Sequence, residues 1–157
     1  AFCCWSTRVI TEIELGHVHG SCVDFNGKSI LAIGPSGSGK TSLILDLIAL
    51  GGVLVADDQV ILSEDANGIT VSAPHTIAGK IEVRGIGILS CPHVNMSYVN
   101  LIVDLSAEPL MRLPEINTVK IGSVSIEIIA GGTVQNLPIT AKILNLYGRD
   151  LANEKVL

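Results

Sequence analysis

A chain of 157 residues is long enough to bury a hydrophobic core, and its length favours one domain, which we place at residues 1–157. The net charge of -5, with no stripe of basic and aromatic residues, argues against DNA or RNA as a partner. No apolar run has the length of a membrane span, and the start lacks the charged region of a signal peptide, so we expect a cytoplasmic protein with no membrane span. The aliphatic composition favours an α/β fold.

The first part of the chain is expected to form two short strands, in residues 8–15 and 16–25. Asn26-Gly27 is a strong signal for a two-residue turn. Residues 21–25 and 28–33 should therefore pair as an antiparallel hairpin. Because the strand before a phosphate-binding loop commonly lies inside a parallel sheet, such a hairpin predicts a mixed sheet with flanking helices.

This hairpin runs directly into a stretch that matches the pattern G-x-x-x-x-G-K-[ST], formed by Gly34, Pro35, Ser36, Gly37, Ser38, Gly39, Lys40 and Thr41. Glycines allow such a loop to turn several backbone N–H groups toward a phosphate, and the following helix presents its positive dipole end to the anion. Lys40 is expected to reach the outer phosphates and Thr41 to ligate magnesium. A glycine-rich turn that binds nothing is the alternative. A helix over residues 42–50, ending at Gly51-Gly52, favours nucleotide binding.

The next apolar strand, residues 53–56, ends in Asp57-Asp58. An acidic pair at the end of a buried strand soon after a phosphate loop is the Walker B arrangement, which places a carboxylate beside the metal and the reacting phosphate. Asp57 could ligate magnesium or orient Asp58, and the pattern leaves both open. Further on we expect a hairpin of residues 59–63 and 69–72, strands at 99–105 and 123–129, and a helix over 137–147.

Residues 80–89 are expected to form one extended segment. Glu82 and Arg84 alternate with apolar neighbours there, so both charged side chains should point to the same side of the strand. On the pattern alone, an ordinary surface ion pair is the simpler interpretation of these two residues.

Several of these motifs together resemble the catalytic domain of HPr kinase/phosphorylase, the bacterial enzyme that phosphorylates a serine of the phosphocarrier HPr. The matching pieces stand in the family's order across residues 19–112. They are His19-Gly20, the phosphate loop, Val55-Ala56-Asp57-Asp58, Ala73-Pro74, Ile81-Glu82-Val83-Arg84-Gly85-Ile86-Gly87-Ile88, and Met111-Arg112-Leu113. The loop by itself indicates only a nucleotide, whereas the E-x-R-G-x-G signature behind it is far more specific.

The resemblance implies a role for each matching residue. Asp58 corresponds to the carboxylate that takes the serine proton, and Lys40 to the lysine that contacts phosphate. Thr41 and Glu82 correspond to magnesium ligands, and His19 and Arg112 to further active-site positions. These parts suit phosphoryl transfer, which depends on alignment and electrostatic stabilisation more than on covalent chemistry.

The function that the resemblance implies is an ATP- and Mg²⁺-dependent serine kinase acting on an HPr-like phosphocarrier of the phosphotransferase system. The fold would be the P-loop type shared with phosphoenolpyruvate carboxykinase, and the family assembles as a hexamer, so a homo-oligomer is implied. Only a short lead precedes His19, so we expect a truncated form without the family's N-terminal domain. Phosphorylase activity is a further expectation, although residues 118–124 lack the arginine pair that the family carries there. A nucleotide-binding sensor without catalysis and a small-molecule kinase remain the alternatives.

Overall fold

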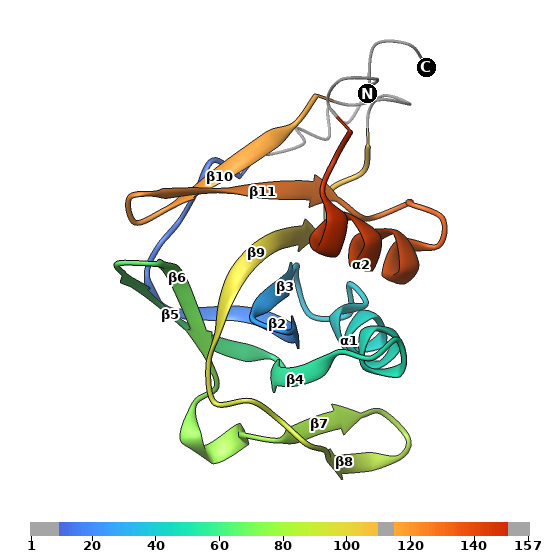
Figure 1. The fold of residues 1–157 in the computed structure, drawn as a ribbon. Coiled ribbons are helices and arrows are strands. Elements are labelled where there is room, and N and C mark those ends of the chain that lie inside the picture. Colours follow the sequence, from blue (N-terminus) through green and yellow to red (C-terminus); the bar gives the residue numbers. More distant parts are fainter. Residues whose placement is uncertain (1–9, 110–114, 151–157) are drawn as a thin grey trace, which may run out of the picture.

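The computed structural model of the chain describes residues 10–109 and 115–150. In this part of the chain the elements follow one another as β1 (Glu12–Ile13), β2 (Gly16–Phe25), β3 (Lys28–Ile33), α1 (Lys40–Ala49), β4 (Val53–Ala56), β5 (Gln59–Asp65), β6 (Gly68–Ser72), a short 3₁₀ helix (His75–Ile77), β7 (Lys80–Val83), β8 (Gly87–Ser90), β9 (Ser97–Asp104), β10 (Asn117–Ile121), β11 (Val124–Ala130) and α2 (Leu137–Tyr147). Figure 1 shows their arrangement.

The main sheet is mixed, as the sequence predicted. Its strands lie in the order β1-β10-β11-β9-β3-β2-β5-β6, with β4 also paired to β2. The strand that leads into the glycine-rich loop, β3, pairs antiparallel with β2 and parallel with β9. The sheet also closes on itself, because β6 pairs with β9 at Thr70↔Tyr98 and Val71↔Ser97. The strands β9, β3, β2, β5 and β6 therefore form a closed ring, and the glycine-rich loop directly follows one of them, β3.

Strand β2 changes its partner half-way along. Its first half pairs antiparallel with β5, ending at His19↔Gln59, and its second half pairs with β4, beginning at Cys22↔Ala56. The two residues that separate β4 from β5, Asp57 and Asp58, therefore lie beside the middle of β2. The pairing pattern brings this acidic pair close to residues that stand far earlier in the chain.

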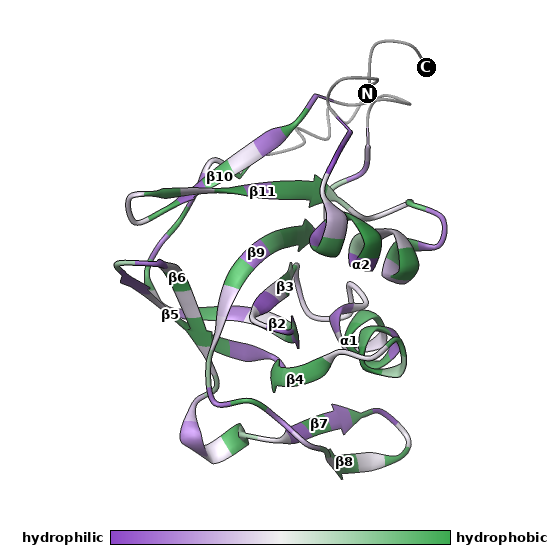
Figure 2. Ribbon diagram, in the orientation of Figure 1, coloured by the Kyte–Doolittle hydropathy of each residue, from purple (hydrophilic) through white to green (hydrophobic). Residues whose placement is uncertain are grey.

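The core consists of two apolar clusters, one on each face of the sheet. Because side chains alternate along a strand, β3 supplies both clusters, with Leu31 and Ile33 on one face and Ile30 and Ala32 on the other. The second cluster includes residues of α1 and α2, and both helices lie on the same side of the sheet (Figure 1). Figure 2 shows apolar residues along the central strands and both helices. The helix that follows the loop is thereby packed firmly onto the strand that precedes it.

Several expectations are confirmed by these elements. The hairpin closed by Asn26-Gly27, the strand before the acidic pair, the β5–β6 hairpin and the C-terminal helix all form where the sequence placed them. Helix α1 begins two residues earlier than expected, at Lys40, and its end at Gly51 has a structural basis. Gly51 has a φ of 101°, and the N–H groups of Gly51 and Gly52 donate to Ile48 and Leu47 in a Schellman arrangement. Among the described residues, neither α1, α2 nor the short 3₁₀ helix is long and apolar enough to cross a membrane.

Residues 80–89 do not form the single extended segment that was expected. They fold into the antiparallel hairpin β7–β8, and Arg84 lies in its turn rather than on the strand beside Glu82. Gly85, with a φ of 83°, and the hydrogen bond from Ile86 N–H to Val83 O close this turn. The two charged side chains therefore do not share a strand face. Strand β10 was also not anticipated; it forms a hairpin with β11 and pairs with β1.

Candidate active site

The glycine-rich loop between β3 and α1 has the left-handed backbone that its sequence predicts. Gly34, Gly37 and Gly39 have φ values of 150°, 83° and 101°. A Cβ atom added at Gly34 would lie 2.6 Å from the Ser38 hydroxyl oxygen, which is closer than real contacts allow. The loop thus requires glycine both for its backbone angles and for the close approach of Ser38.

The loop and the first turn of α1 leave polar groups without protein partners. Helix α1 has no side-chain cap and no acidic residue in its first turn, so its N-terminal N–H groups and positive dipole end are not neutralised. Among the described residues, the Ser38 hydroxyl oxygen is the buried side-chain polar atom that lacks a hydrogen-bond partner. Residues 34–41, the loop and the start of α1, form a cradle. A bound anion would provide hydrogen-bond partners for these unpaired groups, so the cradle fits a phosphate.

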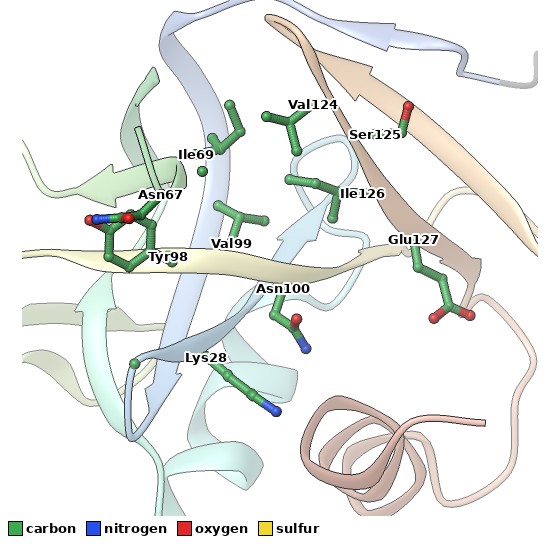
Figure 3. A pocket seen from close by; sticks show the side chains of 12 residues that line it. Lys28, Asn67, Ile69, Tyr98, Val99, Asn100, Val124, Ser125, Ile126 and Glu127 are labelled. Carbon is green, nitrogen blue, oxygen red and sulfur yellow. The ribbon is translucent and has the colours of Figure 1, made fainter. Parts of the chain in front are cut away.

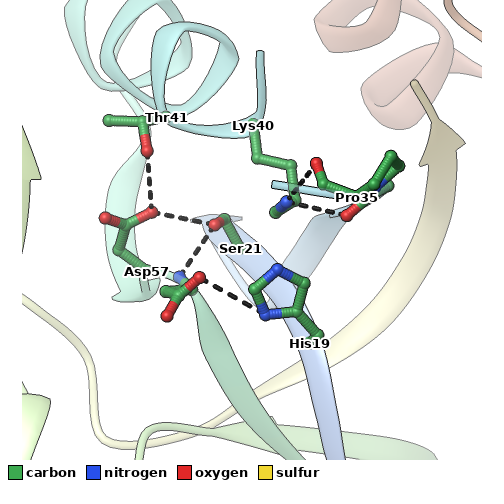
Figure 4. Close-up of polar contacts among 8 residues, drawn as sticks. His19, Ser21, Pro35, Lys40, Thr41 and Asp57 are labelled. Atoms are coloured by element: carbon green, nitrogen blue, oxygen red, sulfur yellow. Dashed lines mark hydrogen bonds and ion pairs between the residues drawn. The ribbon is translucent and has the colours of Figure 1, made fainter. Parts of the chain in front are cut away.

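Lys40, the first residue of α1, turns its side chain back over this loop. It is only 7% exposed, and its Nζ donates to the carbonyl oxygens of Gly34 at 2.7 Å and Pro35 at 3.0 Å (Figure 4). Both acceptors are neutral backbone oxygens, so no carboxylate contacts Lys40 Nζ in these two hydrogen bonds. The structure therefore places the Lys40 amino group against the glycine-rich loop.

Thr41 lies next to Asp57. The Thr41 hydroxyl donates to Asp57 Oδ1 at 3.5 Å, and Ser21 Oγ donates to the same oxygen at 2.8 Å (Figure 4). Asp57 is 7% exposed. A hydroxyl and a carboxylate provide the hard oxygen ligands that magnesium prefers, usually with waters and substrate phosphates completing the shell. This pair fits a magnesium ion, and the described residues contain no cluster of three or more His, Cys, Asp or Glu side chains suited to a metal.

The carboxylate of Asp58 has a different partner from that of Asp57. Asp58 Oδ1 lies 3.3 Å from His19 Nδ1. The Asp58 side chain is 65% exposed and the His19 side chain is 48% exposed. Asp58 has a φ of 71°, a left-handed conformation that few non-glycine residues adopt. Such local strain persists only where surrounding contacts hold it, and it is concentrated at functional sites. The acidic pair therefore supplies one buried carboxylate beside the loop and one accessible carboxylate beside a histidine.

The charge of Asp57 also reaches a cysteine outside the loop. Burial raises the pKa of the Cys91 thiol, and the nearby Asp57 carboxylate raises it further. Cys91 follows the hairpin that carries Glu82, and its backbone N–H donates to Gly79 O. This part of the chain thus lies within electrostatic range of the acidic pair.

One predicted site residue in the described part of the chain is not joined to this group. Glu82 is exposed on β7, and within the described parts of the chain no hydrogen bond or ion pair links it to Thr41. Arg112 lies outside the described residues. Ser21 was missed by sequence reasoning, although it contacts both members of the acidic pair. It is one of several polar residues on β2, so no local pattern in the sequence distinguishes it.

A hollow of about 300 Å³ lies elsewhere, where β3, β9 and β11 begin. Lys28, Tyr98, Asn100 and Glu127 line it, together with apolar residues of β6 and β11 (Figure 3). Because β3 leads away from this hollow toward the loop, the hollow and the candidate site occupy opposite ends of the strand. None of the predicted site residues that the structure describes lines it.

Comparison with known proteins identifies the family. A family model described as the HPr Serine kinase C-terminal domain matches residues 13–107. The chain belongs to this family. The resemblance inferred from the sequence motifs is thereby confirmed, and the matched region contains the loop, the acidic pair, His19 and Glu82.

Relatives from several bacteria carry the same domain. The HPr kinase/phosphorylase of Clostridium tetani is 44% identical over 75 residues, which are 48% of this chain and 25% of that protein. The corresponding protein of Malacoplasma penetrans is 32% identical over 96 residues, 57% of this chain and 32% of the relative. The chain thus spans between a quarter and a third of these curated relatives.

A solved structure extends the similarity to most of the fold. The Hpr(Ser) kinase/phosphatase from Coxiella burnetii is 26% identical and superposes with a TM-score of 0.69, covering 82% of this chain and 87% of that one. The mixed α/β architecture is therefore shared between the two HPr kinase family domains.

Proposed function

We propose that this protein is an ATP- and Mg²⁺-dependent serine kinase whose acceptor is an HPr-like phosphocarrier protein. The observation that carries the proposal is the convergence of four parts around one loop: the Lys40 ammonium, the uncapped start of α1, the Thr41–Asp57 oxygen pair and the Asp58–His19 pair. Membership of the HPr kinase family supplies the substrate class.

The phosphate-binding part of the proposal rests on the cradle formed by residues 34–41. Lys40 Nζ now donates to two loop carbonyl oxygens, and in the nucleotide complex it would exchange these neutral acceptors for phosphate oxygens. Ser38 Oγ would gain the partner that it lacks in the free loop. Hydrogen bonds to a charged acceptor are stronger than those to carbonyls, so the exchange favours the bound nucleotide.

The metal-binding part rests on Thr41 and Asp57, whose oxygens lie together beside the loop. Magnesium held there would neutralise charge on the transferring phosphate. Glu82 remains a proposed further ligand on the strength of the family signature. The contact with Thr41 makes Asp57 the better supported carboxylate of the two.

The acceptor part rests on Asp58, because its carboxylate is accessible to an incoming protein side chain. We assign it the role of general base: it accepts the hydroxyl proton while the serine oxygen bonds to the γ-phosphorus and the bond to ADP breaks. His19, 3.3 Å from Asp58, would hold that carboxylate in place. Arg112 remains a proposed contributor of positive charge.

The test is a phosphotransfer assay with purified protein, Mg²⁺ and ATP against a panel of HPr-type carriers, read by intact mass and by the modified site. The expected result is phosphoserine on a carrier, lost in Lys40→Ala. Asp58→Asn should bind the nucleotide like the parent while its transfer rate falls by about 10²-fold or more. Transfer by Asp58→Asn at the parental rate would remove Asp58 from the role of base. Nucleotide binding with no transfer to any carrier would favour a nucleotide-dependent sensor.

A further inference from the structure

Ser21 is a buried hydroxyl at the centre of the acidic pair. It is fully inaccessible to solvent, in the middle of β2. Its Oγ donates to Asp57 Oδ1 at 2.8 Å and accepts the backbone N–H of Asp58 at 3.0 Å. One hydroxyl thus contacts two consecutive residues that lie 36 and 37 positions further along the chain (Figure 4).

The position of Ser21 on β2 explains why it can make both contacts. It lies between His19, the last residue paired with β5, and Cys22, the first paired with β4. At this change of partner the regular ladder is interrupted, and the backbone N–H of Asp58 has no strand acceptor opposite it. Ser21 Oγ accepts that hydrogen bond instead, while Gly20 N–H donates to Asp58 O at 3.0 Å. The two bonds hold the peptide groups of Asp58 in their left-handed conformation.

The direction of each hydrogen bond of Ser21 Oγ decides how it positions the carboxylates of Asp57 and Asp58. A serine hydroxyl has a single proton, and here it is committed to Asp57 Oδ1. That oxygen also faces the Thr41 hydroxyl, so the bond fixes the Asp57 carboxylate toward the loop. The lone pairs of the same hydroxyl remain available to Asp58 N–H, which fixes the backbone from which the second carboxylate projects toward His19.

We propose that Ser21 is a positioning residue that directs two adjacent carboxylates to different tasks, Asp57 to Thr41 and the metal, Asp58 to His19 and the acceptor serine. The catalytic meaning of this inference rests on the proposed kinase function. Its structural content does not, because both hydrogen bonds belong to the free protein. Groups that hydrogen-bond to a metal-ligating carboxylate typically change metal affinity or activity about 10–100-fold when they are removed.

The experiment compares Ser21→Ala and Ser21→Thr with the matched control Ser29→Ala. Ser29 is equally inaccessible, lies on the neighbouring strand β3 and donates its hydroxyl to Tyr98 O at 2.9 Å, at the end of the strand away from the loop. The control therefore removes a buried serine hydrogen bond of the same kind without touching the acidic pair. If Ser21→Ala does not fold, Ser21→Cys, which keeps the size with a weaker donor, takes its place.

Three readouts are taken on each variant. The first is the set of backbone NMR shifts of Asp58 in nucleotide-free protein, which report its left-handed conformation. The second is the Mg²⁺ concentration that half-maximally enhances binding of a fluorescent ATP analogue. The third is kcat and KM for transfer to a carrier. For Ser21→Ala we expect altered Asp58 shifts, an approximately tenfold higher Mg²⁺ requirement and an approximately tenfold lower kcat with little change in carrier KM. Ser21→Thr, which keeps the hydroxyl, should restore all three values, and Ser29→Ala should leave them at parental values.

The inference is overturned if folded Ser21→Ala keeps the parental Asp58 shifts and Mg²⁺ requirement, or if Ser29→Ala changes them equally. It is also overturned if Ser21→Thr folds but restores none of the readouts. Absence of transfer by the parent protein to every carrier would contradict the proposed kinase function alone. The Asp58 shifts would then still decide the role of Ser21, because they require neither nucleotide nor acceptor.

Discussion

The two ends of strand β3 are both rich in polar groups, but they use them in opposite ways. At the beginning of the strand the polar groups pair with one another: Asp24 Oδ1 accepts the Gly27 N–H at 2.9 Å and the Ser97 hydroxyl at 2.5 Å. Asn145 of α2 likewise donates to Lys28 O and accepts from Asn100. At the loop end, by contrast, Ser38 Oγ lacks a partner and α1 has no cap.

This difference separates polar residues that stabilise the fold from polar residues that we propose to bind a ligand. Buried polar groups that satisfy one another cost little and add specificity to the packing. Groups left unsatisfied are a free-energy cost that binding can recover. We therefore expect changes at the beginning of β3 to lower the free energy of unfolding, and changes at the loop end to lower nucleotide affinity.

The largest effect that would test the difference between the two ends of β3 is expected from Gly34→Ala, which should lower nucleotide affinity. The new Cβ would collide with Ser38 Oγ and distort the loop, so affinity for MgATP should fall on the order of 10²-fold, measured by fluorescence titration. Gly51→Ala is the matched control, because Gly51 is also left-handed but has open space around its Cβ position. It should lower the free energy of unfolding by about 1 kcal/mol and leave nucleotide affinity unchanged. Equal affinity losses in both variants would contradict a specific role for the loop.

Asp24→Ala should have the converse effect. It removes the acceptor of two hydrogen bonds and leaves the buried Ser97 hydroxyl unpaired, so we expect a loss of about 2–3 kcal/mol in urea-induced unfolding with unchanged nucleotide affinity. Asp65→Ala provides the comparison at an exposed turn, where Asp65 Oδ1 accepts two backbone N–H groups and Oδ2 accepts the Tyr98 hydroxyl. Its effect should be smaller, since water can replace the lost acceptor. A loss of nucleotide affinity in Asp24→Ala would break the distinction between the two ends.

A smaller loss of stability is expected from Asn145→Ala. Asn145 is 2% exposed and joins α2 to β3 and β9 through its side-chain amide. Removing it should lower the free energy of unfolding by about 1–2 kcal/mol. Thr140→Ala, at an exposed position of the same helix, should change it by less than about 0.5 kcal/mol. If the two variants unfold alike, the amide contacts do not anchor the helix.

The smallest effect is expected in how the free energy of unfolding depends on pH. Burial, together with the Asp24 charge, raises the pKa of the Cys22 thiol from 9.0 to about 12. Below pH 9 the thiol is protonated in both the folded and the unfolded chain, so it adds no pH dependence. Between pH 9.0 and about pH 12 the Cys22 thiol loses its proton in the unfolded chain but keeps it in the folded chain. The free energy of unfolding should therefore fall by at most about 1.4 kcal/mol per pH unit. Urea titrations of the parent and of Cys22→Ala from pH 8 to 10.5 should show a shallower decline in the variant. Parallel declines would place the titrating group elsewhere.

Local signals in the sequence were sufficient for much of the fold. Asn26-Gly27 specified the hairpin, and the glycine-rich loop with its following helix was placed within two residues. Each of these elements depends on residues that are close in the chain. The pairing of β6 with β9 and the packing of β10 between β1 and β11 depend on contacts between distant segments, and no short pattern encodes them.

The predicted residues of the candidate site also came from local signals. Lys40 and Thr41 were identified by a contiguous motif, and Asp58 by its place in a family pattern. Whether Asp57 faces the loop depends on how β2 passes between β4 and β5, which the sequence does not display. Ser21 was missed for the same reason, since its partners are far away in the chain. The role of Arg112 remains a prediction.

The partner exchange in β2 also has an evolutionary consequence. His19, Ser21 and Asp24 stand on one continuous strand, so their spacing sets the distance from the acidic pair to the polar anchor at the far end. A one-residue insertion between them would turn every later side chain to the opposite face of the sheet. Descendants of this domain should therefore tolerate length variation in the turns at residues 65–68 and 122–123, and almost none within residues 19–24.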